Sequence, residues 1–459
     1  MGTVYTDCTI FIMTEYKNIP TVPSRKLIGH LKEYVSDPIM FLAKNHARYG
    51  DTFRFRLAHR YLIVMRNPDH IKQLMQEHHS IYRKSVAYRK LNVLLGNGLF
   101  TTDGSFWLKQ RRLIQPAFHR EKLAYYFQSI QDFSNELKDS WYDKKEINIA
   151  EEMTAVTLRI ISKALLEIDL KKDDNSVIED NLPFALDFMI KRITSTINVP
   201  LFLPLKKHKR FRSSVSHIEN LIQSIIHEKR TSGIYKNDLL SSLMQVKDAD
   251  TGEVMSDKQL RDEILTIFLA GHETTAMTMS WMFYYICLYP HIQQKIRDEI
   301  FGICGKESIL PNQLNQCVYI KRVVQETLRM MTPIWILGRE ALSQDVIDNI
   351  KICKGDSIIF SPYLIHRHEN YWSDPTNFNP DRKEFEEGYD LHKFAYMPFG
   401  GGPRLCVGSN FAMMEIQILI ITLLQTFKFE LKDKTFPGLN QSLTLRPKNT
   451  IEIAISKVE

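Results

Sequence analysis

FGGGPRLCVG, residues Phe399–Gly408, is a glycine-rich loop that ends at an apolar segment with helical periodicity, from about Val407 to Phe427. Its consecutive glycines allow backbone conformations and close approaches that a Cβ would forbid. Cys406 stands where the helix begins, and the N–H groups and partial positive charge of a helix N-terminus lower a thiol pKa and stabilise the thiolate. Such a thiolate suits the axial position of a haem iron, and Arg404 could bond a haem propionate. The alternative is a buried free cysteine after a flexible turn.

The composite pattern F-x-x-G-x-R-x-C-x-G makes that alternative a poor one. It resembles the haem-ligand signature of the cytochrome P450 family at Phe399, Gly402, Arg404, Cys406 and Gly408. The resemblance implies the cytochrome P450 fold, haem b as the cofactor and Cys406 as the iron ligand.

A second motif, AGHETT, covers Ala270–Thr275 in the middle of a long apolar segment of helical periodicity. Gly271 is unfavourable inside a helix by about 1 kcal/mol relative to alanine, so it requires a reason. Thr274 can bond a carbonyl one turn back and open a groove for dioxygen. Glu273 and Thr274 then form an acid–alcohol pair suited to proton delivery. An ordinary core helix with a back-bonded threonine is the alternative, but the segment matches the family's oxygen-activation motif.

A third motif, ETLR, covers Glu326–Arg329 and places an acid and a base on one helical face. Alone, it would be an ordinary surface pair. In the P450 family this pair is locked by a downstream arginine, which resembles Arg382 in FNPDR here. Lys383 replaces the aromatic residue usual after that arginine, which puts the local packing in doubt. We assign the three residues a structural role.

The family resemblance also extends to Trp107 and Arg111, one helical turn apart, whose counterparts contact a haem propionate. Without the other motifs, these two would indicate only a helix with a half-buried tryptophan. Arg339 and His366 occupy similar family positions near the propionates. The motifs follow the family's order from Trp107 to Gly408, so the resemblance covers nearly the whole chain.

Composition agrees with one globular body. The chain of 459 residues is 44% hydrophobic and 25% charged, without linkers or repeats, so we expect a single haem domain over 1–459 with 1–18 as a disordered extension. Its 60 basic and 53 acidic residues are interspersed, which does not favour nucleic-acid binding. The fold class expected is mainly α, from the long helical periodicities between 106 and 331. A smaller β portion comes from both ends of the chain, beginning with DTFRFRLAHRYLIVM at Asp51.

Cysteine usage and targeting signals indicate a cytoplasmic protein. The six cysteines include no C-x-x-C pair, and no secretory signal precedes them. The apolar stretch Thr9–Met13 is too short to span a membrane, and Met13 is an alternative start. We expect a monomer without a transmembrane anchor. NVPLFLPLKKHKR, residues Asn198–Arg210, is either a packed loop or a mobile entrance lid that touches lipid.

The resemblance implies a monooxygenase that inserts one oxygen atom of O2 into a lipophilic substrate. The expected pocket is mostly apolar and includes Phe100, Ala270, Ile334 to Leu337 and Leu443. A terpenoid-like compound or a fatty acid would fit such a pocket. The run around Arg60 and Tyr61 resembles that of bacterial fatty-acid hydroxylases, in which case these two residues would hold the carboxylate.

Electrons are expected from a separate ferredoxin or flavodoxin with its reductase, because the chain ends soon after the cysteine loop. An acidic donor could dock on a basic cluster, which is equally well explained as a solvated helix; its members are Lys109, Arg111, Arg112, His119, Arg120 and Lys122. The rival functions are a peroxygenase, which the Glu273–Thr274 pair disfavours, and a haem-thiolate sensor without catalysis. A cysteine-nucleophile hydrolase is a distant third.

Overall fold

The computed structural model describes residues 17–167, 172–194, 199–248 and 250–458, and helices dominate it. The helices are α1 (Leu31–Ser36), α2 (Pro38–Tyr49), α3 (Pro68–Lys72), α4 (Val86–Lys90), α5 (Asn92–Leu95), α6 (Gly104–Ile114), α7 (Arg120–Ser140), α8 (Ile149–Leu166), α9 (Lys172–Thr194), α10 (Lys206–Ser232), α11 (Leu239–Gln245), α12 (Asp257–Leu288), α13 (Pro290–Ile303), α14 (Val318–Met330), α15 (Pro362–Ile365) and α16 (Ser409–Thr426). The π-helical turn η1 (Gln73–Glu77) follows α3 directly.

The strands form smaller sheets beside this helical body. They are β1 (Thr52–Leu57), β2 (Arg60–Met65), β3 (Tyr82–Lys84), β4 (Glu146–Asn148), β5 (Leu337–Ala341), β6 (Asp345–Ile347), β7 (Ile350–Ile352), β8 (Ser357–Phe360), β9 (Phe427–Leu431), β10 (Leu439–Gln441), β11 (Leu445–Pro447) and β12 (Glu452–Lys457). The predicted fold class, mainly α with a smaller β portion, is confirmed.

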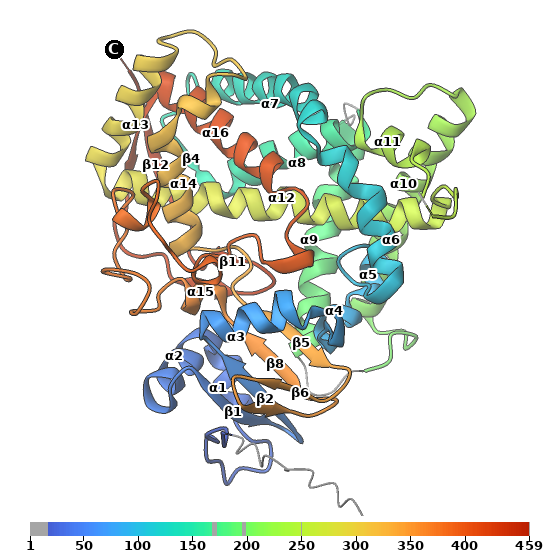
Figure 1. The fold of residues 1–459 in the computed structure, drawn as a ribbon. Helices are drawn as coiled ribbons and strands as arrows, with labels where there is room; N and C mark the ends of the chain where they lie inside the picture. Colours follow the sequence, from blue (N-terminus) through green and yellow to red (C-terminus); the bar gives the residue numbers. More distant parts are fainter. Residues whose placement is uncertain (1–16, 168–171, 195–198, 249, 459) are drawn as a thin grey trace, which may run out of the picture.

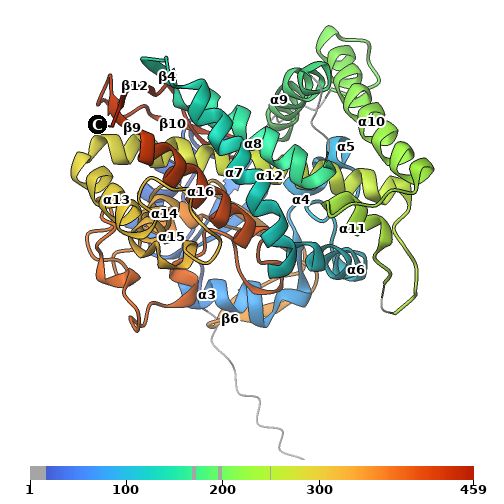
Figure 2. The same ribbon diagram turned by 90° about the horizontal axis from the view of Figure 1, so that it is seen from above.

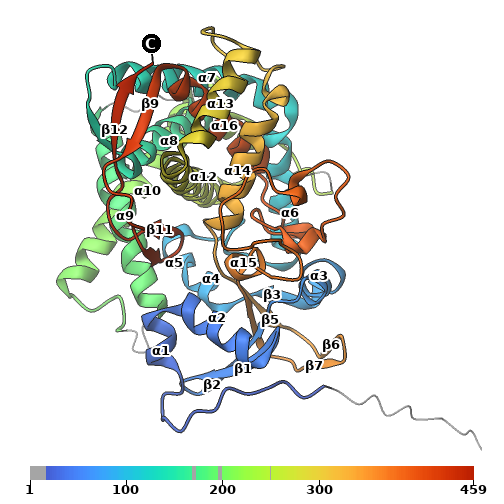
Figure 3. The same ribbon diagram turned by 90° about the vertical axis from the view of Figure 1, so that its left-hand side faces the viewer.

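Helix α12 is the axis of the molecule. It crosses the whole helical body in Figure 1, and Figure 3 views it nearly end-on with other helices around it. A capping box between Ser256 and Gln259 starts the helix, and most of its side chains are buried, which is what an apolar sequence without a polar face requires. Helix α8 packs along α12, and α16 also contacts α12 (Figure 2).

The largest sheet has the order β1-β2-β8-β5-β3 and lies below the helices in Figure 1. Its first hairpin pairs Phe53 with Val64 and Phe55 with Leu62, and both phenylalanines are fully buried, as the alternating pattern at Asp51 predicts. The C-terminal strand β12 pairs instead with β9 on one side and with β4 on the other. The β portion thus draws on both ends of the chain, but in the described residues the two ends do not share a sheet.

Some helix limits differ from those expected. The segment expected to be helical over 312–331 begins only at Val318, because Pro311 and a 3-10 turn at Leu314–Gln316 precede it. Helix α9 starts at Lys172 and tolerates Pro183 in its interior, where periodicity predicts a start near 182. Lys17, at the end of the expected extension, pairs with Asp348 in the β6–β7 turn; residues 1–16 lie outside the described part.

Helix α16 has the length and composition of a membrane span, the one helix among the described residues that does. More than half of that window is buried inside the protein, where α16 packs against α7, α13 and α14. Its apolar sequence is therefore accounted for by its place in the core.

Candidate active site

The glycine-rich loop presents Cys406 to an internal cavity. The Cys406 backbone N–H donates to the Phe399 carbonyl at 2.9 Å and closes the loop just before α16. Gly402 has a φ of +64°, and a Cβ there would stand 2.1 Å from the Met75 carbonyl oxygen in η1. Cys406 is exposed to the cavity it borders, whereas Cys287 and Cys317 are buried in the core. This placement fits a ligand and not a packed cysteine.

The expected lowering of the Cys406 pKa is not found in the protein alone. Burial raises the pKa of the thiol, and the Gly408 N–H and the Arg111 charge oppose that rise without overcoming it. The thiol faces an enclosed space surrounded by protein, so the cost of desolvating a thiolate exceeds the help from the helix start. A bound metal ion removes this cost, because a coordinating thiol is deprotonated outright.

The cavity has a volume of about 310 Å³ and lies between Cys406 and α12. Most of the expected site residues border it, namely Phe100, Trp107, Ala270, Glu273, Thr274, Ile334, Leu337, Arg339, Phe399, Arg404, Cys406, Gly408, Leu443 and Arg111. Gly402 and His366 do not. Its lining is predominantly apolar, as expected for a lipophilic substrate.

His366 is the residue whose expected place near the propionates is wrong. Its buried imidazole donates from Nδ1 to the Arg329 carbonyl at 3.3 Å and accepts the Met397 N–H on Nε2 at 2.9 Å. Burial, aided by the neighbouring Arg329 and Arg367 charges, lowers the His366 pKa to about 3. The ring therefore stays neutral and joins the end of α14 to the segment that leads into the cysteine loop.

Three positively charged side chains, Arg339, Arg404 and Lys84, line one part of the cavity. Arg339 is buried, and its guanidinium group makes one hydrogen bond among the described residues, to the neighbouring Gly338 carbonyl. Arg404 pairs with Asp103 at 2.8 Å, but its Nε is buried without a partner. Lys84, also buried, donates to the Leu99 and Thr102 carbonyls at 2.7 and 2.8 Å. More positive than negative charge therefore faces the cavity at this point.

The charges and the shape of this cavity fit a bound haem. The thiol at the cavity floor, the apolar lining and the excess of buried cations match an iron ligand, a porphyrin ring and two propionates. The orphaned Arg404 Nε is the plainest sign, since a buried guanidinium nitrogen without an acceptor is costly. Arg404, Arg339 and Lys84 would hold the propionates.

Sequence reasoning missed Lys84, which stands in a polar run that gives no hint of burial. Trp107 lies beside this group, with Arg404 Cζ 5.6 Å and Lys84 Nζ 6.0 Å from its ring centroid. Arg111 borders the cavity and also makes a contact that the sequence did not predict. Its Nη1 donates to the Leu405 carbonyl at 2.7 Å, so it holds the cysteine loop directly.

On α12, the Thr274 hydroxyl donates to the Ala270 carbonyl at 2.7 Å, and Thr275 donates to Gly271 at 3.1 Å. Gly271 has a packing reason, because a Cβ there would lie 2.8 Å from the Ile161 side chain of α8. The close contact of α8 and α12 thus accounts for a glycine that the sequence suggested for the oxygen groove.

Glu273 is buried but firmly partnered. Arg446 donates to its Oε1 from Nη2 at 2.6 Å and from Nε at 3.0 Å, and the Thr444 hydroxyl donates to the same oxygen. Both partners belong to the β10–β11 hairpin, whose tip also carries Leu443. Thr444 and Arg446 were missed, although the alternation in SLTLRP places them on one face of a strand.

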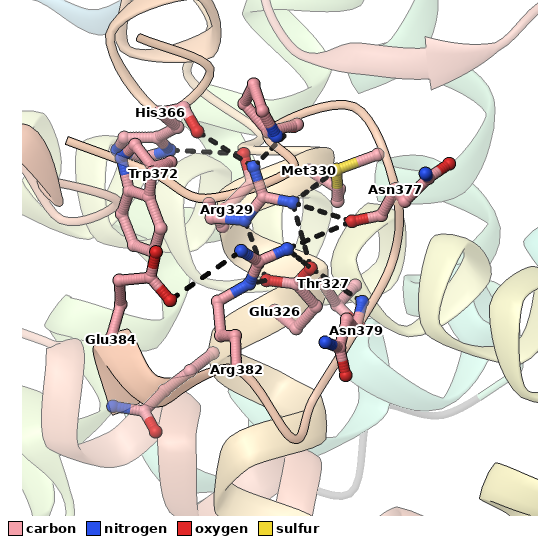
Figure 4. Close-up of polar contacts among 12 residues, drawn as sticks. Glu326, Thr327, Arg329, Met330, His366, Trp372, Asn377, Asn379, Arg382 and Glu384 are labelled. Atoms are coloured by element: carbon pink, nitrogen blue, oxygen red, sulfur yellow. Dashed lines mark hydrogen bonds and ion pairs between the residues drawn. The ribbon is translucent and has the colours of Figure 1, made fainter. Parts of the chain in front are cut away.

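Glu326, Arg329 and Arg382 form one buried network, drawn in Figure 4. Arg329 donates to the carboxylate at 2.7 and 2.8 Å, and Arg382 donates to it at 2.9 and 2.8 Å. The remaining guanidinium N–H groups bond to carbonyls that include those of His366, Ser373, Pro375 and Asn377. The network therefore joins α14 to the loops before the cysteine segment.

The unusual Lys383 leaves this packing intact. Both guanidinium groups lie against the buried Trp372 ring, at 5.2 Å for Arg329 and 5.7 Å for Arg382. Phe385 packs on the same ring with centroids 5.8 Å apart. The aromatic residue that the family motif leads one to expect next to Arg382 is thus supplied further along the chain.

Two members of the basic cluster around α6 are paired with carboxylates. Lys109 pairs with Glu253 at 2.8 Å, and Arg112 pairs with Asp250 at 2.6 Å and Asp248 at 3.4 Å. The expected lid, in contrast, does expose apolar side chains, including Phe202 (79%) and Leu205 (48%). Its first residue, Asn198, lies outside the described residues.

Comparison with known proteins agrees with this site. The family model described as Cytochrome P450 matches residues 20–454. The chain is 28% identical to cyclooctatin synthase of Streptomyces melanosporofaciens over 86% of each chain, and 26% identical to pentalenene oxygenase of Streptomyces avermitilis over 88% and 89%. The crystal structure of the cytochrome P450DA heme domain superposes with a TM-score of 0.89 at 25% identity, covering 97% of this chain and 98% of that one.

The family match spans almost the whole chain and includes the loop that presents Cys406 to the cavity. Its fold implies haem b as the cofactor, and named relatives include monooxygenases. The chain therefore belongs to the cytochrome P450 family and is a haem-thiolate monooxygenase.

Proposed function

We propose that this monooxygenase oxidises a cyclic terpenoid, inserting one oxygen atom of O2 while the other leaves as water. The observation that carries the proposal is the apolar lining of the cavity in front of Cys406, which includes Phe100, Ile334, Leu337 and Leu443. Two similar proteins, pentalenene oxygenase and cyclooctatin synthase, carry names that point to terpenoid chemistry.

In this mechanism the protein binds, orients and excludes water, while the haem, when bound, supplies the O2 chemistry. Cys406 would hold the haem iron through its thiolate, whose electron density would favour O–O cleavage. The apolar residues hold the reacting carbon and keep bulk water out. Glu273 and Thr274, on the α12 wall, deliver the protons that O2 reduction consumes.

Substrate difference spectra test the terpenoid class. Purified enzyme is titrated with a panel of terpenes that includes pentalenene, with lauric acid alongside, and products of turnover with a surrogate ferredoxin and reductase are identified. We expect a terpene to displace water from the iron and to become hydroxylated. A response to lauric acid alone would contradict the terpenoid assignment.

A fatty acid is the second candidate, because several cations lie near one another beside α4. The pKa of Lys90 is lowered by burial and then by the charges of Arg192 and Arg60. Arg60 does not border the cavity, so it would hold a carboxylate only at an outer mouth. Laurate binding that is unchanged in Arg60→Ala would count against this candidate.

A catalytic role and a sensor role give different results with a reconstituted donor. NADPH oxidation that depends on the electron donor and yields an oxidised terpene supports the monooxygenase. Haem that binds ligands but never turns over would support the sensor instead. Turnover with hydrogen peroxide alone, unaffected by Glu273→Gln, would support a peroxygenase.

We also propose an acidic ferredoxin or flavodoxin as the donor, which would dock near Arg111 and Leu405. Ion pairs on Lys109 and Arg112 weaken the case for those two as contacts. Measuring donor affinity against ionic strength tests the electrostatic contribution to docking.

We further propose that the protein is a cytoplasmic monomer and that the exposed side chains of Phe202 and Leu205 form an entrance lid that touches lipid. Liposome flotation of Phe202→Ser tests the contact of the lid with lipid.

A further inference from the structure

A second hollow lies on the other side of α12 from the haem cavity. It has a volume of about 510 Å³, is more open than the haem cavity, and is bordered by α8, α9, α12 and the C-terminal hairpin. Its polar wall includes Asn148, Glu151, His272, Arg446 and Lys448. We call it the side pocket.

The ion pair between Glu273 and Arg446 stands on the boundary between the two spaces. Glu273 borders the haem cavity, and its neighbour His272 borders the side pocket. Arg446 borders the side pocket and reaches Glu273 at 2.6 Å. Exposure of the side chains falls from 38% at Arg446 to 6% at Glu273, so the pair leads from solvent to the buried cavity.

The polar groups of the side pocket suit water. The Asn148 side-chain oxygen is buried without a partner among the described residues, which a water molecule would satisfy. The His272 imidazole donates from Nδ1 to the Phe268 carbonyl at 3.0 Å, and burial lowers its pKa, so it adds no competing positive charge. The charged groups that border the side pocket are therefore Glu151, Arg446 and Lys448, and Arg446 pairs with Glu273 behind it.

The C-terminal hairpin ties this boundary to the substrate cavity. Leu443 and Thr444, in the turn of the hairpin, border the cavity in front of Cys406, and Arg446 follows in β11. Trp335 donates to the Ser442 carbonyl at 2.9 Å, and the Leu445 N–H donates to Pro333 at 2.9 Å. The hairpin that borders the cavity is thus the one that holds Glu273.

We propose that Arg446 is the positioning residue for Glu273 and that the side pocket holds the water from which Glu273 is reprotonated. The reaction RH + O2 + 2H⁺ + 2e⁻ → ROH + H2O consumes two protons for each turnover. Glu273 gives up a proton towards the cavity and takes one back from side-pocket water beside Arg446. This inference rests on the proposed role of Glu273 in proton delivery.

The experiment compares Arg446→Gln, Arg446→Lys, Ala155→Phe and Glu273→Gln, with Lys434→Gln as the exposed control. Ala155 borders the side pocket, and a phenylalanine there would fill part of it. Reduced, CO-bound spectra first show that each variant binds haem. NADPH oxidation with a surrogate ferredoxin is then measured without substrate and with pentalenene, in H2O and in D2O, together with peroxide released and the pH–rate profile.

We expect Glu273→Gln to slow NADPH oxidation by about 10²-fold, the size typical of a lost general acid. Arg446→Gln should show a smaller loss, a larger solvent isotope effect and more peroxide, because the Glu273 carboxylate loses the cation that holds it in place. Arg446→Lys keeps a cation beside Glu273, so its rate, solvent isotope effect and peroxide release should be close to those of wild type. Ala155→Phe should raise the isotope effect without altering Glu273.

The outcomes separate the two levels of the hypothesis. If Glu273→Gln behaves as wild type, the proposed proton role of Glu273 fails. If Glu273→Gln is impaired while Arg446→Gln matches wild type in isotope effect and pH profile, the positioning role of Arg446 is overturned. If only Ala155→Phe matches wild type, the side pocket is not the source of the protons.

Discussion

Gly402 lies directly against the carbonyl oxygen of Met75, so closely that a Cβ on Gly402 would stand 2.1 Å from that oxygen. Met75 belongs to the π-helical turn η1, and π-helical turns are frequent at functional sites. The cysteine loop therefore packs directly against the backbone of η1, which cannot move aside as a flexible side chain could.

Gly402→Ala should lose haem. The substitution adds a left-handed backbone penalty of about 1–2 kcal/mol and a clash that must displace η1 or the loop. We expect a lower ratio of Soret to protein absorbance and a lower thermal midpoint. Gly252→Ala is the matched control, because Gly252 also has a positive φ (+69°) but nothing within 4 Å of its Cβ position. Equal haem content in the two variants would show that the close packing of Gly402 against η1 is not required for haem binding.

Cys406→Ser should abolish the strongly red-shifted Soret band of the reduced, CO-bound enzyme, because that band requires a thiolate ligand. Any haem that the variant still binds in the apolar cavity should show an ordinary Soret position. Cys353→Ser, on the exposed surface, should leave the wild-type band unchanged. A red-shifted band that survives in Cys406→Ser would remove Cys406 as the ligand.

Glu326→Gln should destabilise the fold by about 3–5 kcal/mol, because it removes the carboxylate that two buried guanidinium groups share and leaves only Glu384, 3.9 Å from Arg382, as a counter-charge. The measurement is the urea midpoint of the haem-loaded protein. Asp381→Asn, next to Arg382 in the chain, breaks the half-exposed pair with Lys295 and should cost only about 0–1 kcal/mol. Similar midpoints for both variants would show that the network adds little to stability.

The sequence predicted those parts of the site that depend on local pattern. The loop at Phe399–Gly408, the back-bonding of Thr274 and the pairing of Glu326 with Arg329 depend on residues close together in the chain. Lys84 and Arg446 could not be found this way, because burial and a partner far along the chain give them their importance. The direction of the Cys406 pKa was wrong for the same reason, since desolvation is a tertiary effect.

Lys84→Met should weaken haem retention. Lys84 is buried beside Trp107, and burial lowers its pKa to about 7 in the absence of a propionate. A hydrogen bond to a charged group contributes about 1.5–3 kcal/mol, so haem transfer to apomyoglobin should be roughly 10- to 100-fold faster in the variant. Lys434→Met is the exposed control. Equal transfer rates would exclude Lys84 from the propionate site.

Glu415→Gln should stabilise the protein increasingly as the pH rises. Glu415 is buried on α16, and neither of its carboxyl oxygens has a hydrogen-bond partner in the part of the chain that the structure describes. Burial raises its pKa well above the usual 4.5, only partly opposed by the nearby Thr275 hydroxyl. The folded protein therefore keeps a proton that the unfolded chain releases above about pH 4.5, so this group makes the free energy of unfolding fall as the pH rises.

Removing the carboxyl removes that slope, which is at most about 1.4 kcal/mol for each pH unit. Urea midpoints of wild type and Glu415→Gln should be close near pH 5 and should separate in favour of the variant towards pH 8. Glu452→Gln, an exposed residue of β12, should run parallel to wild type throughout. If Glu415→Gln also runs parallel, Glu415 is ionised in the folded protein, and an unseen cation or water must compensate its charge.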